Sequence, residues 1–109
     1  MALYHQSLTQ EHWQKFSLFE QLGNVGSEVN RALQWRGRDE KLYQNSVWRA
    51  LELLDMTIQD PRWIGRLKEL IRARESLGDA IYGGKEYGST WENLDRYFLQ
   101  FAVAARLKK

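Results

Sequence analysis

Residues 17–35 read SLFEQLGNVGSEVNRALQW, and this stretch decides the fold. Its apolar residues recur in steps of four, three, four and three, which places them on one face of an α-helix. These residues are Leu18, Leu22, Val25, Val29 and Ala32. Ser17 and Glu20 have the spacing of a capping box, and Gly37 supplies the residue expected just after a helix end. The stretch predicts an amphipathic helix from about Ser17 to Trp35.

The same period continues through the middle of the chain. It predicts a helix from about Asp39 to Gln59, with Val47, Leu51, Leu54 and Ile58 on one face. Asp60 and Pro61 then form a corner, because Asp is a preferred N-cap and proline suits the first helical position. A third helix is predicted from this corner to Gly83 and Gly84. Its inward residues are expected to be Ile64, Leu67, Leu70, Ile71, Leu77 and Ile81.

A fourth helix is predicted near the C-terminus, where Ser89 and Glu92 repeat the capping-box spacing. Its apolar face consists of Trp91, Leu94, Phe98, Phe101 and Ala105. Residues 9–15 either form a short leading helix or extend the first helix backward. Short connections between helices of this length favour antiparallel neighbours. The sequence therefore predicts one all-α domain over residues 1–109, an up-and-down bundle of about four helices.

The composition excludes several classes of chemistry. With 43% hydrophobic and 28% charged residues, the chain matches an ordinary globular protein. The absence of cysteine excludes disulfides, thiolate metal sites and a cysteine nucleophile. Only two histidines, His5 and His12, are available as metal ligands or catalytic bases, and the sequence predicts no cofactor. No signal-peptide pattern or membrane-spanning run is visible, so we expect a cytoplasmic protein without a membrane partner.

Acidic pairs are the first candidates for an enzymatic role. Glu52 and Asp55 lie one helical turn apart, as do Glu92 and Asp95, and Glu75 and Asp79 form a third pair. Such pairs can bind Mg²⁺. The all-α nucleoside triphosphate pyrophosphohydrolases use a Glu-x-x-Glu motif, which this sequence lacks. We interpret the pairs as solvated helix faces, and Mg²⁺-dependent nucleotide hydrolysis is the least favoured alternative.

Basic residues gather near the predicted corner and along the third helix. The candidate binding residues are Arg62, Arg66, Lys68 and Arg72, with Trp63 available for stacking. This pattern supports an alternative role as a nucleic-acid-associated or antitoxin-like bundle, although interspersed acidic residues weaken it. Arg74 falls beside the apolar face of this helix, and we expect it to pair with Glu28 or Asp55.

Aromatic residues favour a different role. Five tryptophans are more than a four-helix core of this size needs, so we expect some of them to be exposed at a protein contact. Gly23, Gly26 and Ser27 would let another helix approach closely, within the subunit or across a dimer. The leading hypothesis is therefore a non-enzymatic interaction protein that self-associates as a homodimer.

Four segments resemble a family of short all-helical bacterial and archaeal proteins of unknown function. They are residues 49–63, 66–75 and 26–32 and the segment from Tyr97-Phe98 to Phe101-Ala102. The resemblance extends from about residue 12 to residue 104. It implies one intact helical domain, and it implies no activity and no functional residue.

Overall fold

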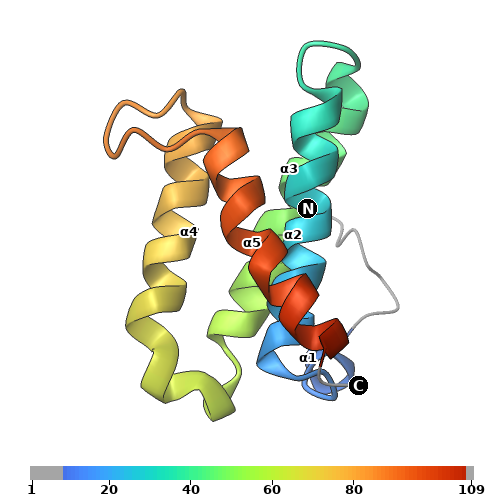
Figure 1. Cartoon of the computed structure of the whole chain (residues 1–109), viewed down its shortest axis with the longest axis vertical. Helices are drawn as coiled ribbons and strands as arrows, with labels where there is room; N and C mark the ends of the chain where they lie inside the picture. Colours follow the sequence, from blue (N-terminus) through green and yellow to red (C-terminus); the bar gives the residue numbers. More distant parts are fainter. Residues whose placement is uncertain (1–8, 108–109) are drawn as a thin grey trace.

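The computed structural model describes residues 9–107, and helices make up every regular element of this part of the chain. The elements are α1 (Gln10–Trp13), α2 (Leu18–Trp35), α3 (Glu40–Ile58), the 3₁₀ helix η1 (Pro61–Arg66), α4 (Leu67–Ile81) and α5 (Trp91–Leu107). The four long helices run alternately up and down (Figure 1). The predicted all-α bundle is confirmed, and residues 9–15 include a short separate helix.

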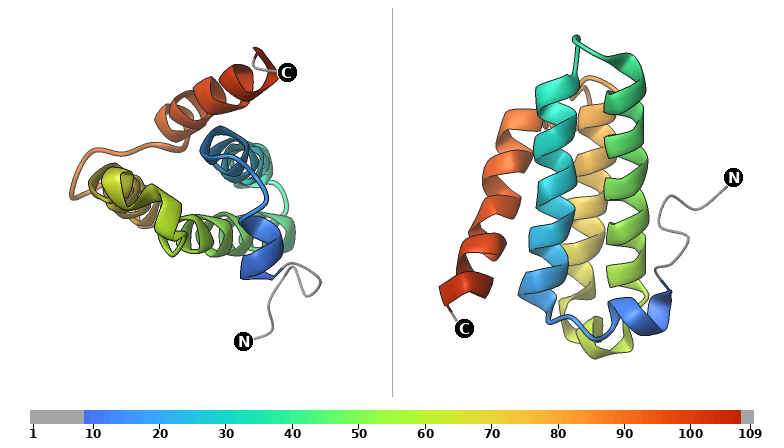
Figure 2. Two further views of the ribbon diagram at one scale, coloured as in Figure 1. Left: turned by 90° about the horizontal axis from the view of Figure 1, so that it is seen from below. Right: turned by 90° about the vertical axis from the view of Figure 1, so that its right-hand side faces the viewer.

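The order of the helices around the bundle leaves α5 at an edge. Helix α2 packs extensively against both α3 and α5, whereas α4 packs mainly on α3 and touches α5 little. Seen from below, the helices follow an arc from α4 through α3 and α2 to α5 (Figure 2). The bundle is therefore closed along three seams and open along the seam between α4 and α5.

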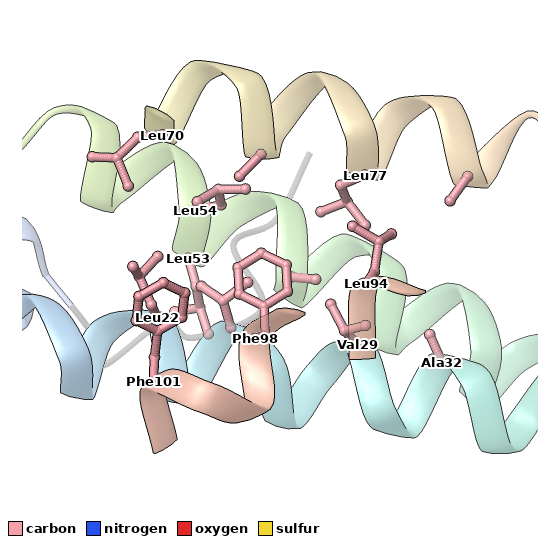
Figure 3. Close-up of a cluster of buried hydrophobic side chains, with 14 of the residues drawn as sticks. Leu22, Val29, Ala32, Leu53, Leu54, Leu70, Leu77, Leu94, Phe98 and Phe101 are labelled. Atoms are coloured by element: carbon pink, nitrogen blue, oxygen red, sulfur yellow. The ribbon is translucent and has the colours of Figure 1, made fainter. Parts of the chain in front are cut away.

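The core lies inside this arc. Leu22, Val29, Leu54, Leu77 and Phe98 are all fully buried, and they come from all four long helices. Figure 3 shows the Phe98 ring of α5 among aliphatic side chains of the other helices. Burying such residues contributes about 1.5–3 kcal/mol each, which makes this cluster the main source of stability.

Local signals set most helix ends where the sequence predicts them. The capping box of Ser17 and Glu20 is formed, with distances of 2.9 and 3.1 Å between each backbone nitrogen and the side-chain oxygen of the other residue. Gly37 has a φ of 77°, the left-handed conformation that glycine adopts most easily. Gly84 also has a positive φ, and a Cβ at this position would collide with the backbone of Ser89.

The third predicted helix differs from expectation in its first turns. Residues 61–66 form a 3₁₀ helix, in which Trp63 leaves helical geometry. Ile64 and Ile71 were predicted to be buried, and this was wrong, because they are 77% and 43% exposed. The buried face of α4 is set by Leu70, Ala73, Leu77 and Ala80, so Ile71 points about 100° away from Leu70.

The start of α5 also differs by one residue. Thr90, and not Ser89, accepts the capping hydrogen bond, from the Asn93 N–H at 3.1 Å. The Ser89 N–H instead donates to the buried carboxylate of Asp79 at 3.0 Å. The connection between α4 and α5 thus takes its shape from a residue of α4, which no local spacing reveals.

Gly23 and Gly26 do allow a close helix approach, and the approaching helix belongs to the same chain. A Cβ at position 26 would lie 2.7 Å from the Phe98 Cβ, and one at position 23 would lie 3.1 Å from the Ala102 Cα. The two glycines therefore fix how closely α5 packs on α2.

Candidate functional site

The predicted basic cluster begins at Arg62, and the structure ties this side chain to Asp60. Its Nη2 lies 2.6 Å from Oδ2 of the fully buried carboxylate and 2.8 Å from the Phe16 carbonyl oxygen. The Arg62 hydrogen bond lowers the pKa of Asp60, although burial acts in the opposite direction. Arg62 therefore closes the corner between η1 and the segment before α2.

Trp63 is likewise joined to a buried polar network. Its Nε1 donates to Oε1 of Gln21 at 3.0 Å, and the Arg62 guanidinium lies 4.4 Å from the centre of its ring. The amide nitrogen of Gln21 donates to the Trp13 carbonyl oxygen at 2.9 Å and to Asp60 at 3.3 Å. Trp63 is therefore partly buried and is not a free stacking surface.

Gln21 and Thr57 are the residues that sequence reasoning missed. Gln21 joins η1 to the segment before α2, while the Thr57 hydroxyl accepts a hydrogen bond from the Trp13 indole at 3.1 Å. Both residues are fully buried. Each lies three residues after a leucine of the apolar face, Leu18 and Leu54 respectively. A polar residue at a core position was the signal that could have identified them.

Arg66 forms an ion pair with Glu69 on the next turn, with 2.8 Å between Nη2 and Oε1. The other oxygen of Glu69 accepts a hydrogen bond from the Tyr97 hydroxyl of α5 at 3.0 Å. Burial and this hydrogen bond raise the pKa of Tyr97 to about 12. The Arg66 hydrogen bond lowers the pKa of Glu69. This trio therefore links α4 to α5.

Lys68 and Arg72 are the two cations of the predicted cluster that remain exposed and unengaged. Within residues 9–107, neither side chain forms an ion pair or a hydrogen bond. The structure therefore divides the predicted binding residues into three that have internal partners and two that have none within residues 9–107. A continuous basic stripe does not result.

Asp79, one of the predicted acidic candidates, has a structural role. Its carboxylate accepts hydrogen bonds from the backbone N–H groups of Glu86, Tyr87 and Ser89 at 2.9–3.1 Å. Burial opposes ionisation, but these hydrogen bonds outweigh it and lower the pKa of Asp79. The carboxylate therefore holds the connection between α4 and α5 in one conformation.

Three of the other acidic candidates, Asp55, Glu92 and Asp95, also have partners. Asp55 binds the Arg74 Nε at 2.9 Å, as predicted, while Glu92 lies 3.2 Å from Arg36. Asp95 accepts a hydrogen bond from Asn30 at 3.1 Å. Within the part of the chain that the structure describes, no group of three or more His, Asp or Glu side chains could hold a metal ion. His5 lies outside this part, and His12 is exposed on α1.

The tryptophans divide into core and surface residues. Trp13 and Trp91 are buried, Trp63 is partly buried, and Trp35 and Trp48 are exposed. The expectation that some tryptophans are exposed is confirmed. The exposed pair lies on α2 and α3.

The outer face of α5 carries a further set of apolar side chains. Leu99, Val103 and Leu107 follow one another at intervals of four residues and are 54%, 45% and 81% exposed. Beside them, a hollow of about 350 Å³ follows the seam between α2 and α5. Gly23, Gly26, Leu99 and Ala102 are among its lining residues. This face combines protruding apolar side chains with a hollow, which is typical of a helix contact.

Comparison with known proteins adds no assignment to this geometry. No family model matches the chain, and no curated protein or solved structure is significantly similar to it. The resemblance described above therefore stays a prediction. Among residues 9–107, no helix has the length and apolar character needed to span a membrane.

Proposed function

We propose that this chain is a non-enzymatic helical interaction protein that forms a homodimer through the outer face of α5. The observation that carries the proposal is the exposed row of Leu99, Val103 and Leu107 on a helix at the edge of the bundle. Helices of globular proteins rarely expose such a row without a partner. The proposed setting is the cytoplasm, with which a chain lacking cysteine is compatible.

A second copy of the chain fits this face because its charges are self-complementary. Glu92, Leu99 and Arg106 are spaced by seven residues and so lie on one side of α5. If a second α5 runs antiparallel with the two Leu99 side chains opposite each other, Glu92 of each copy lies beside Arg106 of the other. The arrangement has a twofold axis, as most homodimers do.

The hollow between α2 and α5 supports the same arrangement. Its lining includes Leu99 and the small residues Gly23, Gly26 and Ala102. An apolar side chain of the second copy would fill it, while Leu99 would enter the equivalent hollow of that copy. Such reciprocal insertion is the ordinary packing mode of paired helices.

Charge reversal tests the proposed dimer. We expect Glu92→Arg and Arg106→Glu each to weaken self-association by about tenfold or more, because each replaces two symmetric attractive pairs by repulsive ones. An equimolar mixture of the two variants restores complementary pairs at both positions, so it should form a heterodimer. Sedimentation equilibrium of each variant and of the mixture measures both effects.

Two controls isolate the proposed face. Arg36→Gln removes the exposed intramolecular partner of Glu92 and should leave the dimer intact. Leu99→Asp should abolish the dimer, whereas Ile71→Asp, at a comparably exposed apolar residue of α4, should not. A wild-type chain that remains monomeric at high concentration, or a mixture that fails to associate, would overturn the proposal.

A further inference from the structure

A cavity of about 370 Å³ lies in the open seam between α4 and α5. The long connection between the two helices passes over the upper end of this seam (Figure 1). Residues of both helices and of the connection line the cavity, among them Arg72, Ser76, Tyr87, Asn93, Leu94 and Tyr97. Its volume lies within the range of about 300–1,000 Å³ that is usual for small-molecule sites.

The walls of the cavity are held in place by hydrogen bonds within the protein, which form without a ligand. On one side, the Tyr97 hydroxyl donates to Glu69 across the seam at 3.0 Å. On the other side, Asp79 fixes the backbone of residues 86–89 through three hydrogen bonds. The cavity is therefore preformed, which reduces the entropy cost of binding.

The charge of the cavity is positive and comes from Arg72. The only acidic residue in its lining, Glu69, is already paired with Arg66. The Arg72 guanidinium has no hydrogen-bond or ion-pair partner within residues 9–107. A free guanidinium binds carboxylate or phosphate groups through two parallel hydrogen bonds. An oxyanion is therefore the chemical group that this cavity fits.

The rest of the lining fits a ligand that is mainly apolar and carries few polar atoms. Leu94 and the rings of Tyr87 and Tyr97 supply apolar surface. The side chains of Ser76 and Asn93 form no hydrogen bonds within the described part of the chain and can bind further polar atoms. Aromatic side chains favour a flat ring as their neighbour.

We propose that this cavity binds a small molecule composed of an aromatic ring and one carboxylate or phosphate group, with Arg72 bound to the anionic group. The site lies on the side of α5 that faces α4, away from Leu99. The proposal therefore stands independently of the dimer.

Nuclear magnetic resonance titration of the full chain tests this site. Benzoate and phenyl phosphate should each cause saturable shifts of the amide signals of Gly88, Ser89 and Asn93 at millimolar concentration or below. The compound that binds more tightly identifies the preferred anionic group. Benzyl alcohol lacks the charge and acetate lacks the ring, so each should bind about tenfold more weakly or worse.

Variants of α4 provide the matched controls. Arg72→Gln should weaken binding of the ring-bearing anions by about tenfold or more, whereas Lys68→Gln, at an exposed cation outside the cavity, should leave it unchanged. Arg72→Lys keeps the positive charge but loses the planar guanidinium that donates two parallel hydrogen bonds, so it should give an intermediate affinity. The proposal would be overturned by an absence of saturable shifts in the wild-type chain. It would also be overturned if Arg72→Gln bound the ring-bearing anions as tightly as wild type, or if wild type bound benzyl alcohol as tightly as benzoate.

Discussion

At the scale of single residues, the lower end of the bundle depends on a network of buried polar groups that joins segments far apart in sequence. Gln21 uses both atoms of its amide, and Asp60 accepts from Arg62 and Gln21. A buried polar group without a partner costs about 1–3 kcal/mol. The corner at Asp60 is therefore stable only while each member of the network is present.

Arg62→Ala tests this network. Removing the guanidinium leaves the buried Asp60 carboxylate without its strongest partner, so the free energy of unfolding should fall by about 1–3 kcal/mol. Lys68→Ala removes an exposed cation without partners and should change stability by less than about 0.5 kcal/mol. Urea unfolding of both variants measures the difference. Equal effects would show that Arg62 contributes no more than a surface charge.

Asp79 gives a prediction for the dependence of stability on pH. Its pKa is lower in the folded chain than the ordinary value of 3.8, so it stabilises the fold above that value and ceases to do so as the pH falls through the folded pKa. Asp79→Asn should melt at a lower temperature than wild type at pH 7. The difference in melting temperature between Asp79→Asn and wild type should become smaller as the pH falls below about 4.

The matched control for this prediction is Glu75→Gln, which removes an exposed carboxylate one turn earlier on α4. Its melting temperature should follow that of wild type across the same pH range. A gap for Asp79→Asn that stays constant on acidification would mean that the charge of Asp79 is not what holds the connection.

At the scale of elements, the contact between α2 and α5 depends on the absence of side chains at two positions. Gly26→Ala would place a Cβ 2.7 Å from the Phe98 Cβ, which cannot move without shifting α5. We expect a loss of about 1–3 kcal/mol, since overpacking exceeds the gain in helix propensity. Thermal unfolding followed by circular dichroism measures this loss.

Gly78→Ala is the control for the same substitution on another helix. A Cβ at this position on α4 would have only an ordinary contact, 3.9 Å from Arg74 Nη1. Alanine should therefore stabilise the chain by about 0.5–1 kcal/mol through its helix propensity. If both substitutions changed the stability in the same direction and by a similar amount, the close packing of α5 on α2 would not explain the effect of Gly26→Ala.

At the scale of the whole molecule, α5 lies at one end of the arc of helices, opposite α4. It packs on α2 and has little contact with α4, so its outer face and the seam beside α4 both offer surface to other molecules. A dimer through the outer face would link folding to association. Its apparent stability would then increase with chain concentration.

The melting temperature therefore reports on the dimer without any labelling. We expect it to rise by about 3 °C for each tenfold increase in wild-type concentration. The Leu99→Asp variant should melt at a temperature that does not depend on concentration. A wild-type melting temperature that is equally independent would contradict the proposed dimer.

The sequence by itself determined where most helices begin and end. The capping box at Ser17, the corner at Asp60 and Pro61, and the turn at Gly37 act through atoms a few residues apart, so local spacing predicts them. The period of apolar residues likewise predicts the buried faces of α2 and α5, because a regular helix repeats every 3.6 residues.

Only the tertiary structure decided which polar side chains are engaged and which are free. Arg62 is held by the Phe16 carbonyl, 46 residues away in sequence, while Arg72 on the following helix has no partner in the described chain. Ile64 is exposed because η1 departs from α-helical geometry. Hydrogen bonds and burial depend on distances between segments that meet only in the folded bundle, and the spacing of residues along the chain does not contain those distances.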